Sequence, residues 1–306
     1  MKVQWGSQDA AAWDAQHAAA LGSLQQDWAY GACLSVMGVP VFRARIMQGD
    51  EVVGLAQFAA RRVGWVANVA LCSFGPVWLN PVSAQDKAQA YRELRKTLPT
   101  WWPRITLFTP EDPDGDATGL SALRRIYTGQ ATVSLDLTLP LDTLRERLDG
   151  KWRNRLVAAE KSGLSVHRVG TNPGQYRWLL DQDEELRERR GLMGLPSGLV
   201  DLYIQSRKQP SRTVLTLRAD QGKDRVAGMM FLLHGQRATY QVGWSNEAGR
   251  ELGAHNLILW AALAELQSRG IRSLDLGIVN TGRSAGLARF KIGTGGEVRR
   301  LTGTYL

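Results

Sequence analysis

The stretch from Ala238 to Val279 constrains the fold of this chain more than any other part of the sequence. It holds, in order, an apolar run rich in aromatic and β-branched residues, a polar turn, an amphipathic segment and a second short apolar run. The apolar residues of the amphipathic segment fall at helical spacing: Leu257, Leu259, Trp260, Leu263 and Leu266. This order predicts strand, loop, helix and strand, and such a crossover joins parallel strands. We therefore expect an α/β (α+β) fold with a mixed sheet and a functional loop where the helix begins.

The same order of elements occurs earlier in the chain. Hairpin patterns span 41–58 and 214–233, and a helix followed by a strand is predicted over 84–108 and again over 256–276. Corresponding positions lie roughly 166 to 174 residues apart, which indicates an internal duplication. Since 306 residues exceed what one core usually serves, we predict domains at 1–148 and 149–306, with the option that the last strand packs on the first domain. Two such domains would leave a cleft, a common place for a substrate site.

Charge is distributed unevenly between the predicted domains. Residues 1–148 hold 14 Lys and Arg and 14 Asp and Glu, so the whole net charge of +9 falls in 149–306. Such a field favours a polyanionic partner, for example RNA, a nucleotide diphosphate or an anionic membrane surface. The alternative is that the arginines simply lie on solvent-exposed faces and mark no binding site.

Several classes of protein are not supported by the sequence. Cys33 and Cys72 do not have the spacing of a metal or redox motif, and His17, His167 and His234 stand apart from other ligand residues, so we expect no metal site. The start of the chain lacks a secretory pattern, and no run is apolar enough for a membrane span. Because only two cysteines occur, we expect a reduced, cytoplasmic protein, with pairing of the two cysteines as the alternative. For the pair Trp101-Trp102 we expect core or interface packing, with stacking on a base as the alternative.

The segment between the two copies, Leu141–Gly163, is basic and predicted to be helical. Trp152, Leu156 and Ala159 share a packing face. The remaining faces carry cations that could clamp a phosphate at a domain junction: Lys151, Arg153 and Arg155. A solvated basic helix is the alternative.

Four stretches, in the right order, carry a resemblance to a known family. They are GKWRNRLVAAEKSGL, GWSNE followed by GAHNLILWAALAELQSRG, SLDLG, and GLARFKIGTGGE. Together they resemble the Fem (FemABX) peptidyltransferases of the acetyltransferase-like (GNAT) superfamily. The resemblance implies two tandem GNAT-like domains and transfer of an aminoacyl group from aminoacyl-tRNA to an amine. In that family the acceptor is the stem peptide of a peptidoglycan precursor, and the active site includes the Phe-Lys pair that falls here on Phe290 and Lys291.

The chemistry of these residues agrees with that role. Acyl transfer to an amine needs stabilisation of a developing oxyanion, and Lys291 offers a cation for an oxyanion or a phosphate. The glycine-rich turn that includes Gly295 could let the backbone approach a ligand closely. The alternative is a tight turn before the last strand, with Lys291 on the surface.

A second resemblance, to acyl-CoA-dependent acetyltransferases, involves the loop before the helix. Arg250 and Gly253 match the loop that holds the coenzyme A pyrophosphate, but His255 replaces a small residue and should crowd that group. His255 is a candidate base, with a capping or packing role as the alternative. Asp275, near a strand end, is a further candidate, or it fixes the following turn.

We therefore expect an acyltransferase or aminoacyltransferase that has no permanently bound cofactor, takes aminoacyl-tRNA as its donor and acts on a small-molecule or peptide amine. The first alternative is an N-acyltransferase that uses acetyl-CoA or another acyl-CoA. The second is a non-catalytic module that binds RNA or a ligand, since fold does not fix chemistry.

Overall fold

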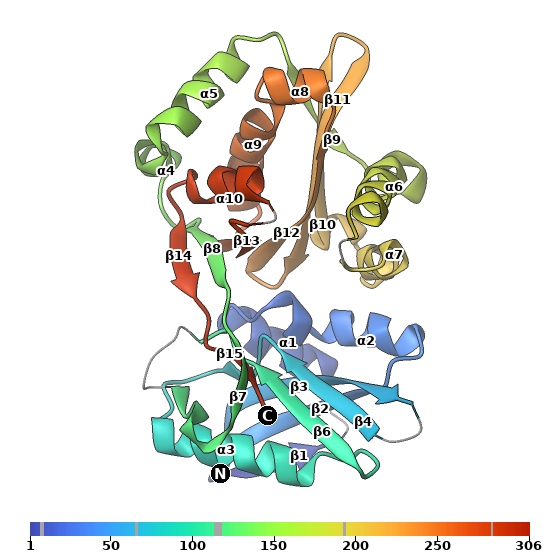
Figure 1. Ribbon diagram of the computed structural model, residues 1–306, viewed down its shortest axis with the longest axis vertical. Coiled ribbons are helices and arrows are strands. Elements are labelled where there is room, and N and C mark those ends of the chain that lie inside the picture. Colours follow the sequence, from blue (N-terminus) through green and yellow to red (C-terminus); the bar gives the residue numbers. More distant parts are fainter. Residues whose placement is uncertain (7–8, 65–66, 113–117, 192–193, 283) are drawn as a thin grey trace. The chain divides into compact units, whose positions relative to one another are not determined.

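The computed structural model describes residues 1–6, 9–64, 67–112, 118–191, 194–282 and 284–306. The chain forms two compact units, one made of 1–131 with 299–306 and the other of 132–298 (Figure 1). The chain passes from the first unit to the second within β8 (Ala131–Asp136) and returns within β14 (Glu297–Arg300). The division thus falls earlier than the expected one after residue 148, because β8 lies between β14 and β13 (Ser273–Val279) in the second sheet.

The first unit is built on an eight-stranded sheet with strand order β1-β2-β3-β4-β6-β15-β7, in which β5 also pairs with β3. Strands β4 and β6 are parallel, and α3 lies between them in the chain. The elements of this unit are β1 (Lys2–Trp5), α1 (Ala10–Ala19), α2 (Trp28–Val36), β2 (Val41–Gln48), β3 (Glu51–Val63), β4 (Ala67–Ser73), β5 (Val77–Trp78), α3 (Ala84–Thr97), β6 (Arg104–Thr109), β7 (Arg125–Thr128) and β15 (Gly303–Tyr305).

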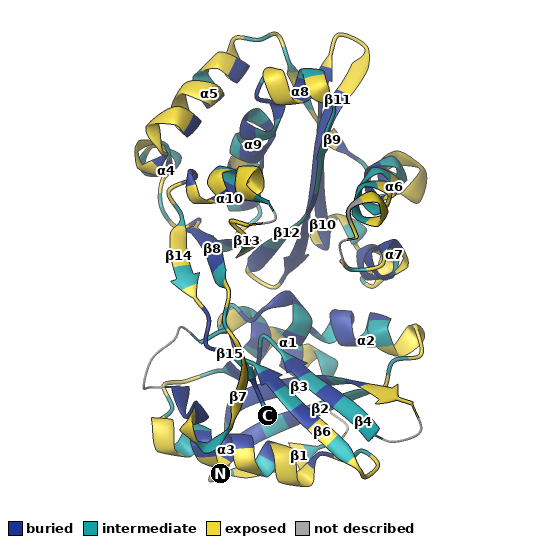
Figure 2. Cartoon of the chain, viewed as in Figure 1, coloured by how far each residue is buried: buried dark blue, intermediate teal, exposed yellow. Residues whose placement is uncertain are grey.

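The two faces of this sheet are packed differently. On the α3 face, the rings of Tyr91 and Phe108 meet edge to face with their centroids 5.0 Å apart, inside an apolar core. Elsewhere the backbone amide of Gln57 donates to Gln26 Oε1 over 2.7 Å, and Gln26 Nε2 donates to the Ser73 carbonyl over 2.8 Å. These buried amides tie the turn before α2 to β3 and β4, since a buried polar group is stable only when hydrogen-bonded. Figure 2 shows the buried strands of the sheet.

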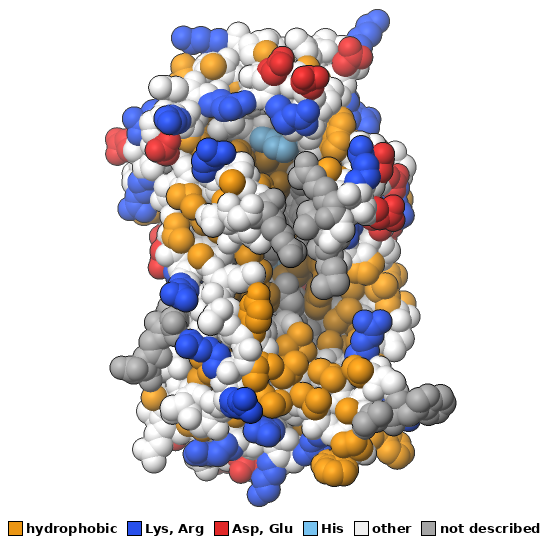
Figure 3. Space-filling model, viewed as in Figure 1, with side chains coloured by type: hydrophobic (Ala, Val, Ile, Leu, Met, Phe, Trp, Pro, Cys, Tyr) orange, Lys and Arg blue, Asp and Glu red, His pale blue; other side chains and the backbone are white. Residues whose placement is uncertain are grey.

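The first unit also exposes large apolar side chains. Trp101 is 85 % exposed and Trp102 is 83 % exposed, so the expected packing in the core does not occur. Figure 3 shows hydrophobic side chains gathered on the visible face of this unit. Val63, the last residue of β3, is 55 % exposed as well.

The second unit is built on a seven-stranded sheet with strand order β14-β8-β13-β12-β11-β10-β9. Strands β12 and β13 are parallel, and α9 crosses between them. Its remaining elements are α4 (Leu141–Arg147), α5 (Gly150–Glu160), β9 (Ser165–Val169), α6 (Pro173–Arg190), α7 (Ser197–Gln205), β10 (Val214–Gln221), β11 (Asp224–His234), β12 (Arg237–Ser245), α8 (Glu247–Glu251), α9 (Ala254–Ser268), β13 (Ser273–Val279) and α10 (Ala285–Ile292).

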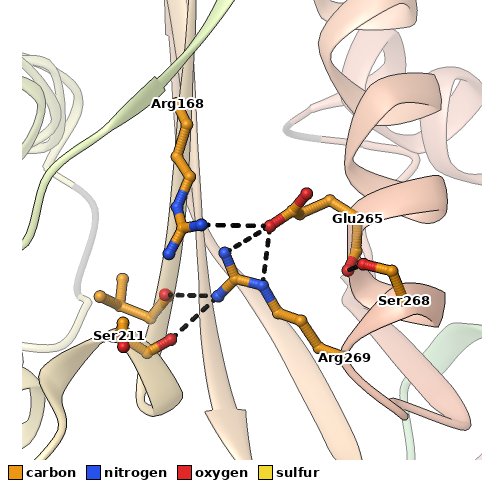
Figure 4. Close-up of polar contacts among 6 residues, drawn as sticks. Arg168, Ser211, Glu265, Ser268 and Arg269 are labelled. Atoms are coloured by element: carbon orange, nitrogen blue, oxygen red, sulfur yellow. Dashed lines mark hydrogen bonds and ion pairs between the residues drawn. The ribbon is translucent and has the colours of Figure 1, made fainter.

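Helix α9 is fixed at its C-terminal end by a charged network. Arg269 donates through Nε and Nη2 to Glu265 Oε1 over 3.0 and 2.7 Å, and Arg168 of β9 approaches the same oxygen to 3.5 Å (Figure 4). Arg269 Nη1 also donates to the carbonyls of Ser211 and Val214, at 2.9 and 3.2 Å. The end of α9 is therefore tied to the start of β10, and the other end of the helix begins at the candidate site.

The duplication expected from the sequence is confirmed. In each unit a parallel strand follows three antiparallel strands and a crossover helix: β2, β3, β4, α3 and β6 in the first, and β10, β11, β12, α9 and β13 in the second. The predicted packing face of α5 is confirmed as well, because Trp152, Leu156 and Ala159 are all buried. Several elements were not predicted, among them α2, β9 and α10.

Candidate functional site

The candidate site lies where β12 and β13 stop pairing. Their parallel register covers only Arg237–Thr239 and Ser273–Asp275, and the rest of both strands, all within the described residues, lies outside it. Two local features accompany this separation. The register between β11 and β12 shifts at Met230 and Phe231, and Gly277 of β13 has a φ of +75°, a backbone conformation that glycine adopts without strain.

Lys291 of α10 reaches into this region. It is 6 % exposed, and its Nζ donates to the backbone oxygen of Ile278 on β13 over 3.0 Å. The same nitrogen lies 5.8 Å from the ring centroid of Tyr240 on β12. Lys291 therefore occupies the space between the two strands, and the alternative of a surface lysine does not hold.

Burial lowers the pKa of Lys291 to about 8, while the negative charge of Asp275 acts in the opposite direction. With that pKa the group is mainly an ammonium at neutral pH. An ammonium has three N–H donors, and the bond to Ile278 uses one of them. A cation with donor capacity in a poorly hydrated place is what stabilisation of an oxyanion requires.

Phe290 fixes the helix that carries Lys291. Its ring centroid lies 5.9 Å from that of Trp152 on α5 and 6.1 Å from that of His255 on α9. Trp152 Nε1 also donates to the carbonyl of Phe290 over 3.1 Å. The Phe290 side chain therefore packs against α5 and α9, and this packing holds the helix that carries Lys291.

His255 is held in one tautomer by its hydrogen bond. Its Nε2 lies 3.0 Å from the carbonyl oxygen of Trp244, which can only accept, so Nε2 carries the hydrogen and Nδ1 the lone pair. Burial is the main cause that lowers the pKa of His255, which keeps the ring neutral at physiological pH. Within one turn of the start of α9, His255 links the end of β12 to Phe290.

Asp275 joins three strands of the second sheet. Its Oδ1 accepts from Thr132 Oγ1 at 3.1 Å and from the amide of Gly277 at 2.7 Å, while its Oδ2 lies 3.5 Å from Arg237 Nη2. The carboxylate thus fixes the backbone of β13 at Gly277, next to the Ile278 carbonyl that accepts from Lys291. Of the two roles that the sequence left open, this geometry favours fixing the backbone that follows Asp275.

The loop that matches a coenzyme A site is packed against α5. A Cβ on Gly253 would lie 3.1 Å from Arg155 Cγ and 3.4 Å from the Ala159 side chain. Arg155 Nη2 donates to the carbonyl of Arg250, whose own Nη1 donates to the Ser245 carbonyl over 2.8 Å. The amides before α9 are engaged within the segment: Gly249 with Asn246 Oδ1, Arg250 with Asn246 O, Leu252 with Ala248 O, and Gly253 with Arg250 O.

The three predicted cations of α5 do not form one clamp. Arg153 Nη2 donates to the carbonyls of Glu146 and Leu148, at 2.7 and 3.1 Å, and so caps the end of α4. Arg155 lies two positions further, on a different face of the helix, and caps α8 instead. Lys151 is exposed and shares the face of Arg155. A cation near the C-terminus of a helix interacts favourably with the helix dipole. Both arginines therefore have a structural role.

The glycine-rich turn approaches the protein's own chain closely. A Cβ on Gly295, whose φ is +71°, would lie 2.1 Å from the carbonyl oxygen of Arg147. A Cβ on Gly293 would lie 2.9 Å from Trp152 Cδ1, and one on Gly296 2.7 Å from the Ser134 oxygen. The glycines are therefore explained by packing against α4, α5 and β8, and no bound ligand is needed to account for them.

Sequence reasoning missed two residues of the site. Tyr240 lies over Lys291, and a Cβ on Gly243 would come within 1.9 Å of the Tyr240 hydroxyl. Both belong to the stretch from Ala238 to Val279, but a tyrosine and a glycine within a strand give no signal of their own. A cavity of about 380 Å³ lies in the first unit, lined by Trp5, Gly6, Trp28, Val41, Phe42, Arg43 and Pro99. Every predicted site residue belongs to the second unit.

The second unit resembles a known family of domains in sequence. Residues 147–291 match the family model of the acetyltransferase (GNAT) domain. Among curated proteins, none matches the chain in sequence. Within the described residues, no helix combines the length and apolar character that crossing a membrane would require.

Solved structures extend the similarity to the whole chain. FemX matches with a TM-score of 0.81 at 14 % identity, over 99 % of this chain and 96 % of its own. The C-terminal domain of a putative lysylphosphatidylglycerol synthetase from Agrobacterium fabrum gives 0.55 at 15 % identity, over 97 % and 92 %. A tandem GNAT protein from the clavulanic acid biosynthesis pathway gives 0.54 at 13 %, over 99 % and 98 %.

These matches confirm the two tandem GNAT-like domains and, at the level of fold, the resemblance to the Fem family. With the family match they support an acyltransferase enzyme.

Proposed function

We propose that this chain transfers an aminoacyl group from aminoacyl-tRNA to an amine. The acceptor that the sequence resemblance implies is the amino group of a peptide on a peptidoglycan precursor. The observation that carries the proposal is the buried ammonium of Lys291, held between Tyr240 and the Ile278 carbonyl where β12 and β13 separate. A group placed there can meet the reacting carbonyl of a bound ester.

The reaction assigns one main role to Lys291. The neutral acceptor amine attacks the ester carbonyl of the donor and forms a C–N bond, and the carbonyl oxygen becomes an oxyanion. The ammonium stabilises that charge in a site where little water competes. The intermediate then collapses with loss of the ribose oxygen, which takes up the proton that the amine releases. The net transfer therefore needs no external oxidant, reductant or further reactant.

The surroundings of α9 support tRNA over coenzyme A as the donor. A coenzyme A pyrophosphate would bind at the amides that lead into this helix. Four of the amides that precede the helix donate within the segment, Gly253 is in contact with α5, and His255 stands where a coenzyme A loop has a small residue. The excess of cations in 149–306 favours a large polyanion as well. Acyl-CoA-dependent N-acylation stays as the second candidate, favoured by the family match of residues 147–291.

Donor binding and turnover test the proposal together. The full chain would be titrated at fixed moderate salt with charged tRNA, uncharged tRNA and acetyl-CoA, and then assayed for release of the aminoacyl group to amino acids, peptides and amino sugars. Preference for charged tRNA with turnover is the expected result. Saturable binding of acetyl-CoA, together with tRNA binding that does not depend on whether the tRNA carries an amino acid, would favour the acyl-CoA reaction. Ligand binding without any turnover would favour a binding module.

A further inference from the structure

Four apolar side chains at one end of the first sheet are unusually exposed. They are Trp101 at 85 %, Trp102 at 83 %, Val63 at 55 % and Ile105 at 40 %. We call this set the tryptophan edge. Single exposed apolar residues are ordinary, whereas a group at one end of a sheet that includes two tryptophans marks an interaction surface.

Strand pairing brings these residues together. Asn68 at the start of β4 pairs with Arg62 of β3 on one side and with Arg104 of β6 on the other. Its Nδ2 donates to the Trp101 carbonyl over 3.1 Å, and its amide donates to the Pro103 carbonyl over 3.0 Å. The loop with both tryptophans is thus hydrogen-bonded to the end of the sheet.

The aliphatic residues lie at the same end. Arg61 pairs with Val69, and Val69 pairs with Ile105, so the three form a row across strands that are about 4.8 Å apart. Val63 is two residues beyond Arg61 and therefore points to the same face of the sheet. Arg104 Nη1 also donates to the Leu98 carbonyl over 2.8 Å, which fixes the start of the loop against α3.

Charge at this end is strongly positive. Segments 59–69 and 91–105 together hold six Lys and Arg, which are Arg61, Arg62, Arg92, Arg95, Lys96 and Arg104, against the single acid Glu93. Glu111 and Asp112 instead follow the opposite end of β6. Cations and exposed apolar side chains therefore coincide at one end of the sheet.

We propose that the tryptophan edge docks on an anionic lipid bilayer. Tryptophan rings settle at the headgroup level of a membrane, and aliphatic side chains gain by entering the acyl boundary. Clustered cations add attraction to anionic lipids, and stable peripheral binding takes two such signals. RNA could stack on the tryptophans, but it would gain nothing from Val63 and Ile105. The inference concerns the first unit and does not depend on the proposed function.

Sedimentation of the full chain with vesicles tests this surface. Vesicles would contain phosphatidylcholine alone or phosphatidylcholine mixed with phosphatidylglycerol. Binding is expected to the mixed vesicles and to weaken with salt. The variant W101A/W102A is expected to lose about tenfold or more in partition coefficient, and R61Q/R62Q about fivefold for each charge, on the anionic vesicles only.

A matched control is available in the same unit. Ile126 and Tyr127 of β7 are a neighbouring apolar pair, 49 % and 61 % exposed, and I126A/Y127A is expected to bind as the wild type does. Circular dichroism melting checks that W101A/W102A stays folded. Absence of vesicle binding, or equal loss in the control variant, would overturn the proposal. So would a tryptophan-dependent affinity for tRNA without one for vesicles, or a dimer that W101A/W102A converts to a monomer.

Discussion

Replacing Lys291 with methionine is expected to lower activity and raise stability, two effects of opposite sign from one side chain. Methionine keeps most of the length of the lysine stem and carries no charge, so the packing near Tyr240 is retained. Removal of one preorganised oxyanion donor costs about 10²–10³ in kcat, or about 2.7–4 kcal/mol of transition-state stabilisation. The expected activity of the variant is therefore at most about one per cent of that of the wild type.

The gain in stability follows from the pKa of the same group. Burial lowers the pKa of Lys291 from 10.5 to about 8, which corresponds to about 3 kcal/mol at about 1.4 kcal/mol for each pH unit. Because the unfolded chain binds this proton more tightly, the ammonium destabilises the fold below pH 8, and this penalty disappears as the pH rises from about 8 to about 10.5. The lost hydrogen bond to Ile278 offsets about 1 kcal/mol. A rise in Tm of about 2–6 °C remains.

Initial-rate transfer assays and thermal melting at pH 7 measure the two effects. Replacement of the exposed Lys161 with methionine is the matched control and is expected to change neither. The wild-type rate is also expected to fall as the pH rises through about 8, because the ammonium is lost, and the methionine variant should lack this alkaline limb. Full activity in the variant, or a Tm lowered by several degrees, would refute the reasoning.

Three further perturbations test the surroundings of this group and the core of the first unit. Gly243→Ala places a Cβ 1.9 Å from the Tyr240 hydroxyl, so kcat should fall, and Tyr240→Phe in the same chain should restore part of it; an unchanged kcat in Gly243→Ala would contradict the contact. Asp275→Asn removes a charge that raises the pKa of Lys291, so the alkaline limb of the pH–rate profile should move to lower pH, and a shift to higher pH would argue against this coupling. Burial raises the pKa of the Cys72 thiol, so it should react with a disulfide reagent only as fast as the chain unfolds; rapid labelling in native buffer would show that the thiol is accessible.

The long periodic segments could be predicted from the sequence. The helix over Ala254–Ser268 and the buried face of α5 follow from apolar spacing, which a helix of three or more turns displays clearly. The hairpins followed from short turns such as the one at Gly49, whose φ of +61° suits glycine. These local signals, repeated in the same order, were sufficient to predict the duplicated fold.

The parts of the site that escaped prediction depend on contacts between distant segments. Helix α10 has only eight residues, too few for a periodic pattern, and it is anchored through Phe290 to helices far away in the sequence. The burial of Lys291 follows from that anchoring, and a lysine gives no sign of it in the sequence. For Trp101 the error was the opposite one, because burial in the core was expected and the side chain is exposed. Tryptophan is usually well buried, and the sequence does not reveal that a loop holds this one in solvent.

The path of the chain between the two sheets has a consequence during synthesis. Residues 299–306 belong to the first unit, where β15 pairs with both β6 and β7. The ribosome makes them only after residues 132–298, a delay on the order of ten to thirty seconds at about 5–20 residues per second. Until then β6 and β7 have no β15 between them. The unit that emerges first is therefore completed last, and its unpaired strand edges are what a chaperone would have to shield in the meantime.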